Sequence, residues 1–177
     1  GFKGVGITGA STNLRVPHHS DFDVDSGEGF AAGGWIKVNT YAGSRWFLGK
    51  GQGSYTPTTT NGWCIASATS PADWYWHIKS GGSNLESSHS TGDGNVGNWI
   101  FMGLGRDGDG TAYKLTSSGR EDYSSKAGDL TTTDDIYIGM SQTGSEIVSD
   151  IQQVFYFNRT LTSAEATALY NSGKPLR

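Results

Sequence analysis

The sequence predicts an all-β protein in which two antiparallel sheets pack face to face, with one short helix near the C-terminal end. Short runs of apolar, aromatic and β-branched residues alternate with clusters of Gly, Ser, Thr, Asp and Asn throughout the chain. Glycine occupies 27 of the 177 positions and charged residues make up 17%, which suits strands and turns better than helices. A chain of this length is expected to form one domain over residues 1–177.

Ten segments carry the pattern of a strand. They are Val5–Thr8, Asn13–Val16, Gly29–Val38, Arg45–Gly49, Gly62–Ala68, Trp74–Lys79, Trp99–Arg106, Thr111–Thr116, Asp135–Gly139 and Asp150–Asn158. Two of the connections between them are long, Gly51–Asn61 and Ser80–Asn98. Loops of that length are usually functional or mobile.

The end of the chain predicts a buried strand followed by a helix. Val154–Phe157 is an unbroken apolar and aromatic run that is too short for most helices, so it favours a strand covered on both faces. Thr162 and Glu165 have the spacing of a capping box, which predicts that a helix begins there. Gly173 suits the left-handed C-terminal position, so the helix is expected to end near Asn171.

Composition argues against several classes of partner. The net charge is -4, and Lys and Arg form no cluster, so a nucleic-acid backbone is not an expected partner. No stretch is apolar enough to span a bilayer, so no membrane insertion is expected. Cys64 is the only cysteine, which excludes an intrachain disulfide, and its position in a strand pattern suggests a small hydrophobic side chain.

Motifs at the start, middle and end of the chain resemble those of the laminin-G-like modules, which are concanavalin A-like jelly rolls related to lectins and glucanases. In the closing strand and helix the matching residues are Ile151, Val154, Asn158, Arg159, Leu161 and Glu165. Earlier matches are Ile7–Gly9, Leu14–Pro17, Phe22–Val24, Phe30, Trp35–Lys37, Asn98–Phe101, Asp107–Gly108 and Tyr113–Leu115. The resemblance implies a jelly-roll sandwich over most of the chain.

The same resemblance raises the question of calcium, because many laminin-G-like modules hold it with carboxylates of the opening segment or of nearby loops. Here Thr8, Ser11 and Thr12 stand in the opening segment, and Gln152 and Gln153 stand where the closing strand would carry acids. A hard dication needs several anionic oxygens to offset its dehydration. We therefore expect no cofactor and no metal requirement for folding.

A second carboxylate pattern, Asp21-x-Asp23-x-Asp25, is similar to the opening of a calcium loop. It has Ser26 and Ala32 where an EF-hand needs its glycine and its final glutamate. The preferred interpretation is a turn whose apolar residues pack inward, and calcium binding is the alternative. Asp107–Gly110 likewise favours a hairpin turn.

The strand Trp74–Lys79 provides the candidate binding face. Alternation places Trp74, Trp76 and Ile78 on a core face, and Tyr75, His77 and Lys79 on the other side, which is expected to be exposed. An aromatic plate beside polar groups suits a sugar, which presents an apolar ring face and hydroxyls. An ordinary exposed strand is the alternative. The candidate ligand-binding residues are Tyr55, Tyr75, His77 and Lys79.

No catalytic residues are predicted. The string E-x-D-x-x-E of related glucanases does not occur, and the clusters Arg120–Asp122 and Asp134–Asp135 fall in predicted turns. The leading hypothesis is a non-catalytic module that binds a glycan or glycosylated surface, located extracellularly, on a cell surface or on a virion. The alternative is a structural or decoration module that binds protein partners, for which aromatics in Val154–Phe157 supply a contact. Glycoside hydrolysis is a weaker third hypothesis.

Overall fold

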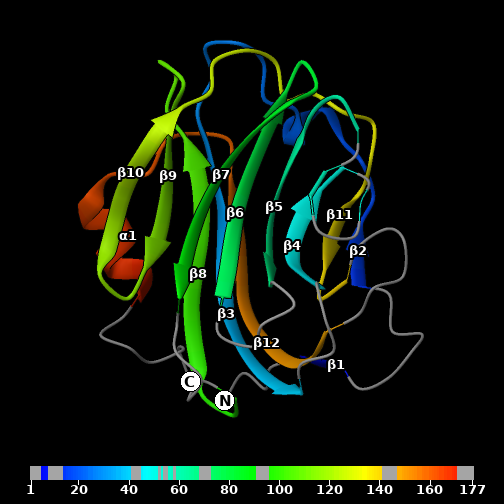
Figure 1. Ribbon diagram of the computed structural model, residues 1–177, viewed down its shortest axis with the longest axis vertical. Helices are drawn as coiled ribbons and strands as arrows, with labels where there is room; N and C mark the ends of the chain where they lie inside the picture. The colour runs from blue at the N-terminus through cyan, green and yellow to red at the C-terminus, as the bar shows by residue number, and fades with distance from the viewer. Residues whose placement is uncertain are drawn as a thin grey trace.

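The computed structural model describes residues 5–7, 14–40, 45–51, 53, 56–57, 59–67, 73–90, 96–140 and 147–170. Within these ranges two six-stranded antiparallel sheets pack face to face, and one short helix lies against the outside of one of them (Figure 1). The predicted fold class, an all-β sandwich with a short C-terminal helix, is confirmed.

We call the sheet next to the helix sheet I and the other sheet II. Sheet I has the order β1 (Val5–Ile7), β12 (Val148–Phe157), β3 (Phe30–Thr40), β8 (Trp99–Arg106), β9 (Thr111–Thr116), β10 (Gly119–Ser125). Sheet II has the order β2 (Leu14–Val16), β11 (Ile136–Ile138), β4 (Arg45–Lys50), β5 (Gly62–Ser67), β6 (Asp73–Ser80), β7 (Ser83–Ser90). A 3-10 turn, η1 (Ser20–Phe22), follows β2, and α1 (Ser163–Tyr170) follows β12.

The core lies between the two sheets and depends on the inner face of β6. Trp74, Trp76 and Ile78 are all 0% exposed, as strand alternation predicts. The indole N–H of Trp76 donates to the backbone oxygen of Gly103 at 2.7 Å, so a side chain of sheet II is bonded to the backbone of sheet I. Because Trp74, Trp76 and Ile78 face the core, the residues that alternate with them along β6 face outward.

The predicted capping box begins the helix. The Glu165 amide donates to Thr162 Oγ1 at 3.2 Å, and the Thr162 amide donates to Glu165 Oε2 at 2.9 Å. In the strand before it, Tyr156 packs on the core between the sheets, whereas Phe155 packs on the outer face with the helix. The run is therefore lined on both faces as predicted, although Val154 is 36% exposed. Gly173 lies outside the described residues.

Two edge strands correct the sequence prediction. The predicted loop after Ser80 contains β7, and Arg120–Asp122, predicted to lie in turns, belongs to β10. An edge strand pairs on one side only, so it needs few apolar side chains, and polar residues protect its free edge. Gly81 and Gly82, with φ of 57° and 80°, form the tight turn between β6 and β7. That Gly-Gly pair was the signal for the missed hairpin.

Candidate functional site on the outer face of sheet II

The outer face of β6 carries the sequence-predicted binding residues. In the antiparallel register, Tyr75, His77 and Lys79 lie opposite small residues of β5, which are Ala66, Cys64 and Gly62 in that order. Directly paired residues project to the same side of a sheet. The rings of Tyr75 and His77 therefore lie beside small side chains of β5. The predicted separation of the two faces of β6 is therefore correct.

The predicted exposure of this face is wrong for His77. Its side chain is 0% exposed, whereas Tyr75 and Lys79 are half-buried. The segment that ends at Asn61 contributes to this cover, because Lys79 Nζ donates to the Pro57 backbone oxygen at 2.9 Å. The prediction assumed a bare strand face, whereas a chain segment lies against one end of it. Tyr55, the fourth predicted residue, lies outside the described residues.

Burial also sets the charge of His77. Desolvation lowers its pKa to about 4, with a hydrogen bond to Asn84 acting in the opposite direction. Its Nδ1 lies 3.2 Å from Asn84 Nδ2 and 3.4 Å from Glu86 Oε2. The ring lies nearly parallel to that of Tyr75, with 6.1 Å between centroids and 12° between planes. A neutral histidine ring therefore lies beside the Tyr75 ring at pH 7.

Trp46 is a residue of this face that the sequence prediction missed. It pairs with Ala66, and the register slips between Trp46 and Leu48, so a bulge separates the two residues. Simple alternation would place both side chains in the core, but only Leu48 lies there. Trp46 instead forms a separate apolar cluster with Cys64 and Ala66, and all three are 0% exposed.

Cys64 behaves as the sequence predicted. Its thiol forms no disulfide and is fully buried, and burial raises its pKa. A thiol in that state is a poor nucleophile. It therefore serves as a small packing residue beside His77, the residue it pairs with on β6.

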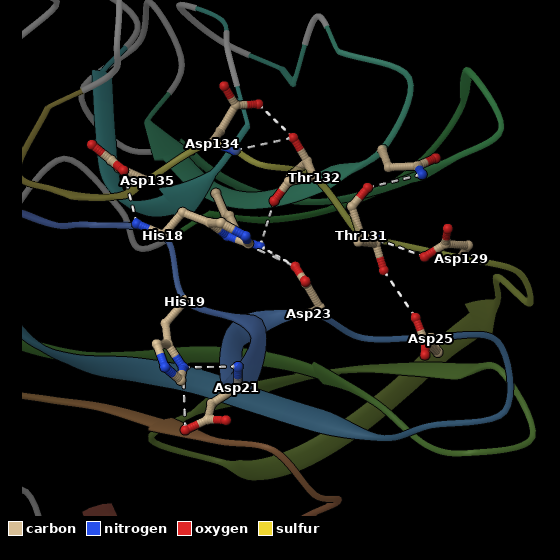
Figure 2. Close-up of polar contacts among 12 residues, drawn as sticks. His18, His19, Asp21, Asp23, Asp25, Asp129, Thr131, Thr132, Asp134 and Asp135 are labelled. Atoms are coloured by element: carbon tan, nitrogen blue, oxygen red, sulfur yellow. Dashed lines mark hydrogen bonds and ion pairs between the residues drawn. The ribbon is translucent and has the colours of Figure 1, made fainter.

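The aspartates of the Asp21-x-Asp23-x-Asp25 segment have different partners (Figure 2). Asp23 Oδ1 accepts from Lys50 Nζ at 2.7 Å, and Asp25 Oδ1 accepts from Thr131 Oγ1 at 3.1 Å. Asp21 Oδ2 lies 3.4 Å from Nδ1 of the neighbouring His19. Within the described ranges, no group of three or more His, Cys, Asp or Glu side chains is arranged to hold a metal ion. Metal-independent folding stays a prediction.

Other acids nearby hold loop backbone in place. Asp135 Oδ1 accepts from the His18 amide at 2.9 Å, and Asp129 Oδ1 accepts from the Thr131 amide at 2.7 Å. Figure 2 shows that the His18–Asp135 contact joins the segment after β2 to the segment before β11, and that the Asp129–Thr131 contact lies within the latter. The carboxylates therefore join two loops and do not face a common point. The apolar residues Phe22 and Val24 pack inward, as the turn interpretation predicts.

Comparisons with known proteins define the fold. No protein-family model matches the chain, and no curated protein sequence matches it. Among solved structures, the botulinum neurotoxin serotype D binding domain matches 95% of this chain with a TM-score of 0.72 and 11% identity. The binding domain of Paraclostridial Mosquitocidal Protein 1 matches 91% of it with a TM-score of 0.69 and 13% identity.

A third match is a structure of botulinum neurotoxin type C, whose cell entry depends on interaction with two ganglioside molecules. It covers 83% of this chain with a TM-score of 0.63 and 16% identity. The chain has the β-sandwich fold of these toxin binding domains. It spans only 42%, 41% and 36% of the length of the serotype D, Paraclostridial and type C chains, respectively. The described part of the sandwich contains no helix with the length and hydropathy needed to cross a bilayer.

Proposed function

We propose that residues 1–177 form one laminin-G-like, concanavalin A-like jelly-roll domain that binds a glycan without catalysis. The binding residues are Tyr75 and Lys79 on the outer face of sheet II, and the site acts at an extracellular, cell or virion surface. The observation that carries the proposal is the half-buried Tyr75 ring, held nearly parallel to the buried His77 ring beside small residues of β5.

Each of these residues has a distinct role in the proposal. The accessible part of the Tyr75 ring packs against the apolar face of a pyranose. His77 is a positioning residue, because its full burial keeps it from touching a ligand. The Lys79 ammonium has three N–H donors, and its bond to Pro57 uses one, so the others are suited to sugar hydroxyls. No step of bond breaking is required.

The structural neighbours support this proposal at the level of fold. They are binding domains, which agrees with a non-enzymatic role. One of them comes from a toxin that depends on gangliosides, and a ganglioside carries a glycan. Identity is 16% or lower for these proteins, so the ligand of this chain is inferred from its own site and not carried over.

A glycan array on the purified chain tests the proposal, followed by titration of the strongest hit with two variants. Tyr75→Ala removes the ring and is expected to lower affinity at least about tenfold, equivalent to about 1.4 kcal/mol. Tyr75→Phe keeps the ring and is expected to retain most of the affinity. A uniformly negative array, or a hit whose affinity Tyr75→Ala leaves unchanged, would contradict the proposed site.

A structural or assembly role is the second candidate, and the outer face of sheet I favours it. Partly buried aromatic side chains gather there around Trp35 and Phe101; they are Trp99, Phe155, Phe157 and Tyr170. Aromatic residues are enriched in protein interfaces. Size-exclusion chromatography with light scattering separates the two functions, because assembly predicts a stable oligomer and glycan binding alone predicts a monomer.

A further inference from the structure

An apolar pocket of about 210 Å³ lies between the two sheets, away from the face that carries Tyr75. Its walls come from both sheets, with Ala32 and Tyr156 on sheet I and Leu48 and Ile138 on sheet II. Every lining side chain among the described residues is apolar or aromatic, and none of these carries a charge. The pocket therefore belongs to the core but has access to solvent through its rim.

The rim consists of side chains that a well-packed sandwich would cover. Val16 on β2 is 37% exposed and Val154 on β12 is 36% exposed, and both line the pocket. In the described ranges, the large apolar side chains that are exposed are Leu14, Val16, Val96 and Val154, and all but Val96 lie on these two strands. Exposed apolar residues that are scattered singly are ordinary, whereas Val16 and Val154 border the same pocket.

The backbone of β12 is irregular beside this pocket. The register between β12 and β3 slips between Gln152 and Phe155, and Gln153 has φ of 51°, in the left-handed region that non-glycine residues seldom occupy. Among the described residues, β1 pairs with β12 at Ser149–Ile151, and β2 is the edge strand of sheet II.

The chemistry of the lining selects the occupant. At about 30 Å³ each, roughly seven water molecules would fill this volume, and those against the walls would find few polar partners. The described lining side chains offer only the Tyr156 hydroxyl and the Trp63 indole N–H. For comparison, a smaller apolar cavity of about 150 Å³ in an engineered protein stays dry and binds benzene.

We propose that this pocket binds an uncharged hydrocarbon group, either an aromatic ring or a short alkyl chain. A charged group is disfavoured because the lining side chains that the structure describes hold no opposite charge to offset its desolvation. The binding is driven by burial of apolar surface and requires no covalent step. The pocket is separate from the Tyr75 face, so this inference does not depend on glycan binding.

NMR titration of the labelled protein tests the proposal with three probes: benzene, n-octyl β-glucoside below its micelle concentration, and glucose. We expect benzene to shift the backbone amides of Val16, Val154 and Tyr156. If octyl glucoside causes the same shifts and glucose causes none, the alkyl tail of an amphiphile is an occupant. Shifts with benzene alone identify a small free hydrocarbon.

Two variants and a matched control identify the pocket. Val16→Phe places a larger side chain at the rim, and Ala32→Val fills the inner wall; each is expected to weaken benzene binding at least about fivefold. Val96→Phe changes another exposed valine, which does not line the pocket, and is expected to leave binding unchanged. Tyr75→Ala is also expected to retain benzene binding, which separates this site from the glycan site. The proposal is overturned if benzene shifts none of the lining amides, or if both pocket variants retain full affinity.

Discussion

Lys50 Nζ lies 2.7 Å from Asp23 Oδ1, and the lysine side chain is completely buried. The ammonium also donates to the backbone oxygen of Thr132 at 2.7 Å. The aspartate in the middle of the calcium-like segment therefore neutralises a buried charge from β4. This contact connects sheet II, the segment after η1 and the loop before β11.

Asp23→Asn is expected to destabilise the protein by roughly 3 kcal/mol, because it leaves the buried Lys50 ammonium without its counter-charge. Urea unfolding at pH 7 measures this change. The double variant Asp23→Asn with Lys50→Met removes both charges and should recover much of the loss. Asp21→Asn is the control, because that side chain is 76% exposed and its change should stay within about 0.5 kcal/mol. Equal effects of the two single variants would argue against the role of the ion pair.

His77 is expected to make stability depend on pH between about 6.5 and 4. Its folded pKa of about 4 lies below the ordinary histidine pKa of 6.5, so the unfolded chain binds the extra proton within this window. The contribution of neutral His77 to the free energy of unfolding is therefore fully present above pH 6.5. The free energy of unfolding falls by up to about 3 kcal/mol as the pH drops to 4. Urea unfolding across this range should show a shallower slope for His77→Gln. An unchanged slope would show that another group is responsible.

The capping box is expected to act at lower pH. The Arg159 guanidinium, then the Thr162 amide and hydroxyl, lower the pKa of Glu165 to about 2. A lowered carboxyl pKa means that this stabilisation is present above about pH 4.5 and is lost as the pH falls toward 2. At pH 7, Thr162→Ala should cost about 1 kcal/mol in urea unfolding. Thr167→Ala on the same helix serves as the control and should cost less than about 0.5 kcal/mol.

Arg106 is expected to resist even conservative replacement. It is 1% exposed, and its guanidinium donates to the backbone oxygens of Asp25, Glu28, Lys126 and Gly128. A lysine has fewer donors and lacks the planar fork, so Arg106→Lys should cost about 2 to 3 kcal/mol.

Arg15→Lys is the matched control for that measurement. Its side chain is 59% exposed and pairs with Asp135 at the surface, so a change below about 1 kcal/mol is expected. Both variants are compared by urea unfolding at pH 7. Similar losses of stability for the two variants would contradict the expected contribution of the Arg106 hydrogen bonds.

Treatment with EDTA is expected to leave the melting temperature unchanged. Asp23 and Asp25 bind a lysine and a threonine, respectively, and do not share a common point with Asp21 (Figure 2). Differential scanning calorimetry with and without chelator measures this, with magnesium and calcium added back as a control. A fall of several degrees that calcium reverses would demonstrate a metal site and contradict the prediction.

Local sequence signals predicted the elements whose cause is local. The tryptophan face of β6 followed from strand alternation, and the start of α1 followed from the spacing of Thr162 and Glu165. β7 and β10 were missed because an edge strand is specified mainly by backbone pairing with its neighbour, which polar side chains permit. Only the Gly-Gly turn before β7 carried a local signal.

The sequence by itself determined the all-β class, the buried face of β6 and the role of Cys64 as a small hydrophobic residue. Tertiary structure decided which outward residues remain accessible. His77 is fully buried, and a bulge places Trp46 on the outer face of sheet II. It also decided that the strands β2 and β12 leave a pocket between the sheets. Alternation along one strand predicts which side of the sheet a residue occupies. Whether another segment covers that residue, where the strand register shifts, and where a pocket remains between the sheets depend on segments distant in the sequence.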